Sequence, residues 1–443
     1  MPPPLLIENG TLLSTGGTPF VRRKQCLLIE DGLITRVAPR DRFGRFTGRR
    51  LDAAGKVVLP GLINAHTHCY SAFARGLVGI KPSGDFLGVL RHLWWKLDSV
   101  LSPEDCYYSA LSALLESIRH GTTMLIDHHA SPGTVGGSLD AIARAVGETG
   151  LRACLCYEVS DRDGARVARE GLAENVRFIR RCREDQSPHL RALFGLHASF
   201  TLSDKTLQAA ADLGRGLGTG FHIHVAESQA DQRAARRSSR LGVVERLQRF
   251  GILGDQSIAA HGIHVSPLEM DKLAETRTAV VHNPQSNLNN AVGIADVIGM
   301  WQRGVLVGLG TDAMTTNMLE EVRVALWAQH LASGNPSAGF AEVTGALFAG
   351  NAEIAGRIFG LRFGELRRGC AGDVAVYDYD PPTPLQSANA LGHVLFGLSQ
   401  APVDSTIVGG RVLMEHRRLQ LDLDEPRVNA RARELAKNLW QRL

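Results

Sequence analysis

The chain has 443 residues, of which 44% are hydrophobic and 21% are charged. These proportions are typical of a folded globular protein, and they exclude a mainly disordered, collagen-like or coiled-coil chain. The formal net charge is only +4, so the composition predicts neither a nucleic-acid nor a membrane partner. The length suits about three average domains, or one large barrel with a smaller domain.

The N-terminal stretch MPPPLLIENGTLLSTGG has no cationic start followed by a sustained apolar core, so we do not expect a signal peptide. No apolar run is long enough to span a bilayer. The seven cysteines include no CxxC pair, which favours reduced thiols over a disulfide scaffold. Together these features predict a cytoplasmic protein.

Both ends of the chain have the pattern of short β-strands. Residues 1–59 contain strand-like runs broken by Asn-Gly, Asp-Gly and Gly-Lys turns. Residues 373–380 and 404–419 have the same texture, with a Gly-Gly turn inside the second run. We therefore expect residues 1–59 and 361–422 to pair into one small β domain, with residues 423–443 forming a C-terminal helix.

The middle of the chain, residues 60–360, alternates between apolar β-rich runs and helical patterns. Helical segments include residues 104–121, with a Ser-Pro-Glu start signal at Ser102 and a stop at Gly121, and residues 138–150, 201–214 and 317–334. Eight apolar runs precede helix-compatible segments, which predicts an α/β fold of the (β/α)8 TIM-barrel type. The runs are residues 57–66, 122–129, 152–159, 190–197, 220–227, 257–264, 278–285 and 305–312.

Histidines gather at the ends of these runs. In a barrel of this type the chemistry lies at the carboxyl ends of the strands. Ten of the 16 histidines stand at such ends, together with Asp312 after the eighth run. Scattered core histidines would not follow this pattern. The ten are His66, His68, His128, His129, His197, His222, His224, His261, His264 and His282.

The first of these clusters has the spacing of a metal site. His66 and His68 are two residues apart, so in a strand both imidazoles point to one face. A His-x-His triplet by itself often occurs by chance, at the surface or in the core. With His224 and Asp312 it would make a set of three nitrogens and one oxygen that leaves room for a water, which marks a catalytic metal. We expect one divalent ion, zinc, with iron as the alternative.

Two further residues fit a proton-transfer role beside this ion. Glu227 lies three residues after His224, where its carboxylate could carry protons without binding the metal. Alone, it would be read as an exposed or salt-bridged loop residue. His261 could orient the attacking water, although an isolated histidine there would be an ordinary core residue.

Several stretches together resemble the amidohydrolase superfamily, in particular its deaminase branch, which acts on adenosine-type compounds, guanine and chlorotriazines. They are PGLINAHTH, FHIHVAES, AAHG, VVHNPQSNLNN and VGLGTDA. HTHCYSAFARG, LWWKLDSVLS, IDHHASP, GGSL and GHVLFGLS are similar to the SsnA-type aminohydrolases. The resemblance implies a TIM barrel with a small composite β-sandwich built from both termini, and a homodimer or higher homo-oligomer.

The resemblance also implies roles for individual residues. His66, His68, His224 and Asp312 match the metal ligands, Glu227 the proton-shuttling glutamate and His261 the histidine that contacts the water. Binuclear relatives carry a carboxylated lysine on the fourth strand, and residues 190–197 contain no lysine, which implies a single metal.

The resemblance and the long segment after the first run suggest the substrate contacts. Asp98 falls where adenosine-type deaminases carry an acidic residue for the ribose hydroxyls, and His197 where some relatives contact the base. Trp95 belongs to the glycine-rich segment 69–98, which would be either a lid that stacks on a planar substrate or a subunit contact. Arg75 and His129 are further candidates.

The favoured function is hydrolytic deamination of a purine-like nitrogen heterocycle, a small molecule, at a non-peptide C–N bond. One alternative is hydrolysis of a cyclic amide or a substituted triazine. Another is a barrel that has lost catalysis and serves as a binding subunit, although all the expected ligands are present.

Overall fold

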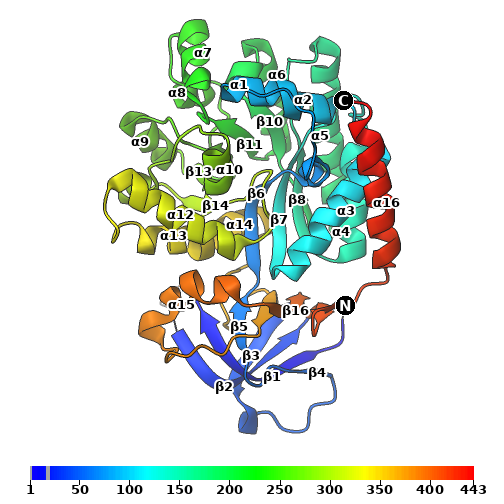
Figure 1. The fold of residues 1–443 in the computed structure, drawn as a ribbon, viewed down its shortest axis with the longest axis vertical. Helices are drawn as coiled ribbons and strands as arrows, with labels where there is room; N and C mark the ends of the chain where they lie inside the picture. Colours follow the sequence, from blue (N-terminus) through cyan, green and yellow to red (C-terminus); the bar gives the residue numbers. More distant parts are fainter. Residues whose placement is uncertain (1, 16–19) are drawn as a thin grey trace.

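The computed structural model describes residues 2–15 and 20–443. Residue 1 and residues 16–19, which fall within the predicted β segment 1–59, lie outside the described residues. The fold is mixed α/β: one sheet is built from both ends of the chain, and two parallel sheets are surrounded by helices (Figure 1). No helix in the described part of the chain is long and apolar enough to cross a membrane.

Strands from both ends of the chain form one nine-stranded sheet. Antiparallel pairing of β5 with β15, in which Val57 lies opposite Tyr377, joins the N-terminal strands to the C-terminal ones. The predicted pairing of the two ends is therefore observed. The nine strands are β1 (Leu5–Ser14), β2 (Phe20–Glu30), β3 (Leu33–Pro39), β4 (Arg49–Asp52), β5 (Val57–Pro60), β15 (Val374–Tyr377), β16 (Val403–Val408), β17 (Arg411–Glu415) and β18 (Arg418–Leu419).

The other strands form two parallel sheets of four and five strands. Every residue of β6–β8 and β10–β14 is buried, as expected for parallel strands that are covered on both faces. The first sheet contains β6 (Leu62–Thr67), β7 (Thr122–His129), β8 (Arg152–Tyr157) and β9 (Leu190–Ala192), and the second β10 (Phe194–Ala198), β11 (Phe221–Val225), β12 (Ile258–His261), β13 (Ala279–His282) and β14 (Val307–Leu309).

The first predicted run, residues 57–66, is two strands rather than one. β5 belongs to the nine-stranded sheet and β6 to a parallel sheet. The chain changes sheets at Pro60-Gly61, where a Cβ on Gly61 would lie 2.2 Å from the Thr123 hydroxyl oxygen, so only glycine allows this close approach.

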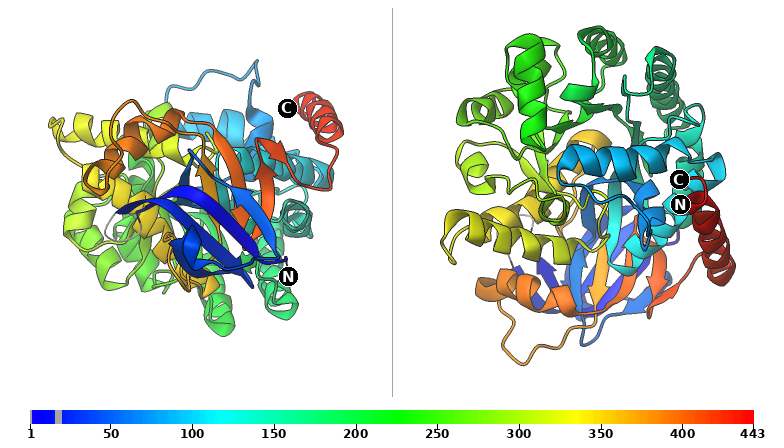
Figure 2. Two further views of the ribbon diagram at one scale, coloured as in Figure 1. Left: turned by 90° about the horizontal axis from the view of Figure 1, so that it is seen from below. Right: turned by 45° about the horizontal axis from the view of Figure 1, so that its top comes forward.

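Helices follow the parallel strands and cover them (Figures 1 and 2). The predicted helix start at Ser102 is a capping box in which Ser102 and Asp105 satisfy each other's backbone amides. The helices are α1 (Phe86–Val89), α2 (Trp95–Ser99), α3 (Pro103–Arg119), α4 (Ser138–Thr149), α5 (Ala165–Asp185), α6 (Asp204–Leu217), α7 (Gln229–Ser239), α8 (Val243–Arg249), α9 (Pro267–Glu275), α10 (Pro284–Asn289), α11 (Val297–Gln302), α12 (Met318–Ser333), α13 (Phe340–Gly345), α14 (Asn351–Phe359), α15 (Ala390–Phe396) and α16 (Glu425–Trp440).

Short helical turns complete the chain. The turn η2 follows β6 directly, and η3 is a π-helical turn between α1 and α2. The turns are η1 (Arg40–Arg42), η2 (Cys69–Ala74), η3 (Leu90–Trp94), η4 (Ser199–Thr201), η5 (Ala346–Gly350), η6 (Ser387–Asn389) and η7 (Leu398–Gln400).

The C-terminal helix α16, shown in red in Figure 1, lies along α3. Leu435 and Leu439 pack into a cluster with Tyr70 and Phe73 of η2, and the Trp440 indole N–H donates to the Phe73 carbonyl over 2.7 Å. The helix therefore fixes the segment that follows β6.

Candidate active site

The predicted ligands converge at the carboxyl ends of the parallel strands. His66 and His68 end β6, His224 comes from β11, and Asp312 follows β14. One nitrogen or oxygen atom from each of His66, His224, His261 and Asp312 lies within 4.8 Å of the others, as is also true of a second set, His66, His68, His128 and His224. All these side chains are buried. The geometry thus brings together residues up to 246 positions apart in the sequence.

Hydrogen bonds to backbone carbonyls fix the tautomers of two ligands. The Nδ1 atom of His68 donates to the carbonyl of His128, and Nδ1 of His224 donates to that of His197 over 2.9 Å. In each neutral ring Nε2 then carries a lone pair. These two Nε2 atoms lie 3.2 Å apart, too close for two lone pairs unless a cation or a proton lies between them.

A similar chain of hydrogen bonds orients His66. The Cys156 thiol donates to the carbonyl of Asp127, so its sulfur can accept from Nδ1 of His222 at 3.7 Å. Nε2 of His222 then accepts from Nδ1 of His66 over 2.8 Å. This leaves Nε2 of His66, which is buried without a partner, as a third lone pair directed at the cluster. Such outer hydrogen bonds are typical of metal-binding histidines.

Asp312 supplies the negative charge of the cluster. Its Oδ1 atom lies 3.0 Å from Nε2 of His68 and 3.6 Å from Nε2 of His66, and its Oδ2 atom accepts from the Ser286 hydroxyl. Burial alone would raise the pKa of Asp312, but contacts with the two histidines hold it well below its usual range. For His68, burial alone would lower the pKa, but the contact with Asp312 outweighs burial and raises the pKa to about 9. The cluster therefore favours a positive charge at its centre.

These donors fit a divalent metal of the zinc class. Three imidazole nitrogens and one carboxylate form a common set for a catalytic zinc ion. The orphaned Nε2 atom of His66 is the kind of buried polar atom that needs a partner.

Glu227 and His261 lie beside the cluster. Oε2 of Glu227 is 3.5 Å from Nε2 of His261, which is 3.9 Å from Oδ2 of Asp312. Burial, together with the charge of Asp312, raises the pKa of Glu227 well above its usual value, which favours its protonated form. Nδ1 of His261 pairs with Oδ1 of Asn287 at 2.8 Å, which leaves Nε2 of His261 as a base. One acid and one base thus face each other.

Backbone strain coincides with the same residues. His261 and Asp312 have φ values of 75° and 51°, and Ala226, directly before Glu227, has 49°. Non-glycine residues rarely adopt this left-handed conformation, and where they do they cluster at functional sites. This backbone conformation points the side chains in directions that an ordinary strand end would not give.

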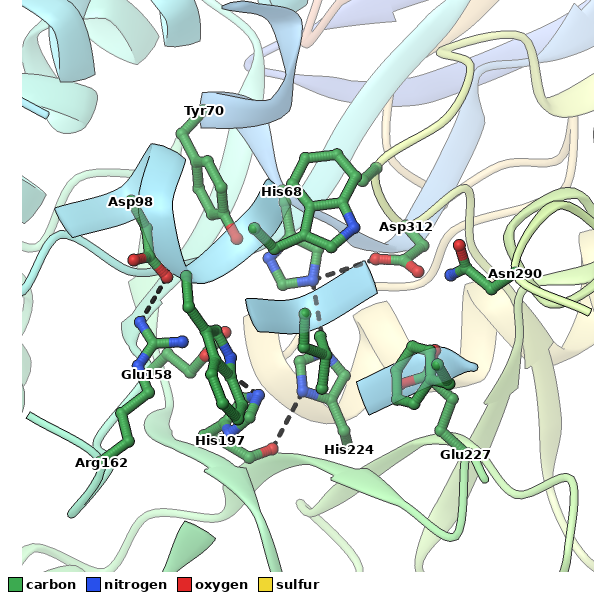
Figure 3. A pocket seen from close by; sticks show the side chains of 15 residues that line it. His68, Tyr70, Asp98, Glu158, Arg162, His197, His224, Glu227, Asn290 and Asp312 are labelled. Atoms are coloured by element: carbon green, nitrogen blue, oxygen red, sulfur yellow. Dashed lines mark hydrogen bonds and ion pairs between the residues drawn. The ribbon is translucent and has the colours of Figure 1, made fainter. Parts of the chain in front are cut away.

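A pocket opens over the cluster, and Figure 3 shows its walls. Its residues come from the metal cluster, from the segment 69–98 and from the strand ends. Residues of that segment therefore form part of the pocket wall. The lining residues are His68, Tyr70, Phe86, Leu90, Trp94, Trp95, Asp98, Glu158, Arg162, His197, His224, Glu227, Asn290, Asp312 and Ala313.

Three of the five predicted substrate contacts, Trp95, Asp98 and His197, line this pocket. The other two do not. Arg75 is exposed and pairs with Glu116 over 2.9 Å beside α16, because η2 turns the chain away from the pocket. His129 is buried behind the pocket wall, where its Nε2 atom pairs with the Ser131 hydroxyl over 3.0 Å.

The sequence interpretation missed Glu158 and Arg162. Glu158 directly follows β8, the same strand-end position that identified the histidines, and Arg162 lies four residues further on. The position of Glu158 directly after a strand was therefore the signal that could have identified it.

The chain is similar to known proteins in both sequence and fold. The sequence profile of the amidohydrolase family matches residues 57–413. A 5-methylthioadenosine/S-adenosylhomocysteine deaminase of Pelotomaculum thermopropionicum is 31% identical over 451 residues, covering 99% of both chains. A 5'-deoxyadenosine deaminase of Methanosarcina mazei is 31% identical over 450 residues, again covering 99% of each chain. Among solved structures, a zinc-bound adenosine deaminase of Xanthomonas campestris is similar, with a TM-score of 0.86, 24% identity and 98% coverage of each chain.

Proposed function

The chain belongs to the amidohydrolase family, and on this basis we propose that it is a metal-dependent hydrolase that removes an amine from a purine-like heterocycle as ammonia. The single observation that carries the proposal is the buried cluster of His66, His68, His224 and Asp312, whose imidazole Nε2 atoms and carboxylate are directed at one point, with Glu227 beside it. The relatives named above as adenosine-type deaminases support this substrate class.

In this proposal the four residues hold one divalent cation, zinc, with iron as the alternative. When bound, such an ion acidifies water and polarises the reacting group. The bound zinc of the Xanthomonas campestris structure supports the choice of metal.

The chain's own residues carry the protons. Glu227 gives its proton to the ring nitrogen next to the amine-bearing carbon. His261, with Asp312 beside it, takes a proton from the attacking water. The water oxygen bonds to that carbon, the amine receives the proton held by His261 and leaves as ammonia, and the proton of the added hydroxyl returns to Glu227. Overall, water and the aminated heterocycle yield the oxo heterocycle and ammonia. Trp95 and His197 would contact the ring.

The test combines metal analysis with an ammonia assay on one sample. We expect about one zinc ion per chain and ammonia release from a panel of purines, pterins and pyrimidines. Opening of a cyclic amide consumes substrate without releasing ammonia, so a time course separates that alternative. Protein without bound metal that stays inactive when zinc is added would overturn the proposal.

We further propose that the two parallel sheets close into one eight-stranded barrel, in which β9 and β10, separated only by Leu193, count as one strand. Parallel bridges between Thr67 and Asp312 and between Val159 and Leu196 link the two sheets at both junctions. Side chains from both sheets, including Ile63, Ile126 and Val281, pack into one buried cluster. Both observations support closure.

The same arrangement supports the domain division 1–59 plus 361–422, with a barrel of residues 60–360 and a helix over 423–443. The two layers of a β-sandwich stay a prediction, since hydrogen bonds join the strands of the first unit into one sheet.

We also propose a homo-oligomer. Trp327 and Leu331, one turn apart on α12, are 50% and 77% exposed, and an exposed apolar pair of this kind favours a subunit contact. Light scattering on the purified protein would give the mass, and a monomer would refute this.

A further inference from the structure

The end of the pocket away from Glu227 holds a second group of charges that the proposed chemistry does not use. Figure 3 shows Asp98, Glu158 and Arg162 on one side of His68 and His224, with Glu227 and Asn290 on the other. The side chains of Asp98, Glu158 and Arg162 are only 1%, 4% and 9% exposed. This end, called here the charged end, is therefore closed to solvent.

Arg162 is the donor of the charged end. One terminal nitrogen, Nη2, is hydrogen-bonded to Oδ2 of Asp98, and Nε is bonded to Asp163 over 2.8 Å. Figure 3 shows its other terminal nitrogen turned toward the centre of the pocket. The guanidinium carbon lies 5.3 Å from the centre of the Trp95 ring, so packing as well as charge fixes its position.

Two carboxyl groups supply the acceptors. Oδ1 of Asp98 is buried without a hydrogen-bond partner. Glu158 lies 3.4 Å from Nδ1 of His128 and 3.5 Å from Nε2 of His197.

The protons of those two histidines point away from Glu158. Nε2 of His128 donates to the His222 carbonyl over 3.2 Å. The Thr201 hydroxyl donates to the Ala198 carbonyl over 3.1 Å, so Nδ1 of His197 donates to that hydroxyl over 2.6 Å. Glu158 therefore faces two lone pairs, and no side chain of residues 2–15 or 20–443 donates to it from that direction. The charged end lacks a hydrogen-bond donor that a ligand could supply.

One Arg donor beside carboxyl acceptors matches the five-membered ring of an unsubstituted purine. That ring offers one N–H and one unprotonated nitrogen on the same edge. The N–H can donate to Asp98 or Glu158, and the bare nitrogen can accept from Arg162. A sugar on this ring replaces the N–H and adds bulk at an end where no solvent opening receives it.

The opposite end has more room. A second hollow, lined by Ser83, Gln229 and Arg233, shares Phe86 and Asn290 with the pocket. In the proposal that follows, a ring enters past Asn290 with its far edge leading toward Arg162.

We propose that Arg162, Glu158 and Asp98 form a specificity subsite that selects a free heterocyclic base with an unsubstituted ring N–H over its N-glycoside. This inference rests on the proposed function and deepens it by naming the substrate class. It assigns to this chain a preference different from the nucleosides in the names of its relatives. Asp98 then contacts the ring instead of the ribose hydroxyls that the resemblance implies for its position.

The test compares matched pairs on the zinc-loaded full-length protein: adenine with adenosine, and guanine with guanosine. The 9-methyl bases remove the N–H with little added bulk. We expect kcat/KM for a free base to exceed that for its nucleoside at least about 100-fold, with the 9-methyl base close to the nucleoside, because a site built to bond an N–H rejects an analogue without it. Equal or better turnover of nucleosides would overturn the inference while leaving the proposed function intact.

Binding measurements distinguish failure of the specificity subsite from failure of the proposed function. If no compound releases ammonia, the proposed function fails, and calorimetry with xanthine and xanthosine on the wild-type protein then decides the subsite. Binding of xanthine alone supports it, whereas equal binding of both, or of neither, overturns it.

Variants identify the residues. Arg162→Gln should lower kcat/KM for the free base about 10- to 100-fold through KM and reduce the preference for base over nucleoside, with metal content unchanged. Arg166→Gln, at an exposed arginine four residues away, is the matched control and should behave as wild type. Should Arg162→Gln misfold because Asp98 is left unpaired, Asp98→Asn/Arg162→Gln removes both charges. A loss that is equal for base and nucleoside would indicate a merely structural role.

Discussion

Replacement of Glu227 by glutamine tests the proton-transfer hypothesis most directly. The change keeps the size of the side chain and removes only the transferable proton. Glu227 belongs to neither set of residues that could hold the metal, and its nearest charged partner is His261 at 3.5 Å. The substitution should therefore leave both the fold and the bound metal intact.

The expected loss follows from this geometry. Removal of a positioned general acid typically costs about 10²- to 10⁴-fold in rate, equivalent to about 3–5 kcal/mol in the activation barrier. Because burial and Asp312 raise the pKa of Glu227 and so favour its protonated form, the loss should appear in kcat. KM should change little, since glutamine can still hydrogen-bond.

The assay is ammonia release from the best substrate of the heterocycle panel, with metal content measured on the same preparation. Glu275→Gln, at an exposed glutamate at the end of α9, is the control. A Glu227→Gln protein that carries metal and retains more than about a tenth of wild-type kcat would refute the assigned role. Loss of metal from this variant would instead show that Glu227 is a ligand.

Other predictions concern the metal, the C-terminal helix and pH. Asp312→Asn should lose most of its bound zinc and at least about 100-fold in activity, because it removes the only carboxylate of the cluster; atomic absorption checks this, and full zinc content would contradict it. Deletion of residues 425–443 uncovers the apolar cluster around Leu435 and Leu439 and should lower the free energy of unfolding by about 3–6 kcal/mol, measured by urea titration; an unchanged midpoint would contradict the packing. Burial alone would raise the pKa of Asp404, but its hydrogen bond with Lys56 outweighs burial and lowers that pKa. A lowered pKa stabilises the fold only while the carboxylate is ionised, so Asp404→Asn should cost about 1 kcal/mol above about pH 4. That difference should vanish as the pH falls through the lowered pKa, and a constant difference in thermal melts down to pH 2 would contradict the assignment.

The sequence predicted the centre of the site better than its edges. His66, His68, His224 and Asp312 could be found because parallel strands bring their carboxyl ends to one side, so a strand-end position carries three-dimensional information. Arg75 stands near the first motif in sequence but outside the pocket, since η2 turns the chain away after His68. The position of a residue within a loop gives no comparable information about where its side chain lies.

Other features depended on contacts that no local pattern encodes. The pairing of Arg162 with Asp98 joins residues 64 positions apart, and neither neighbourhood indicates the other. The run 57–66 looks continuous because both of its halves are apolar. Only the two different sheets that receive them, on either side of Gly61, separate β5 from β6.

The pairing of β5 with β15 has a consequence for biosynthesis. A ribosome must translate both parallel sheets before Val374 emerges, so β5 waits with one edge unpaired while most of the polypeptide is made. Exposed strand edges are templates for aggregation, and pairings between distant segments form slowly. The nascent chain is therefore most vulnerable after its catalytic half has been translated and before its last strands arrive, and any product that stops short of Val374 keeps that edge open permanently.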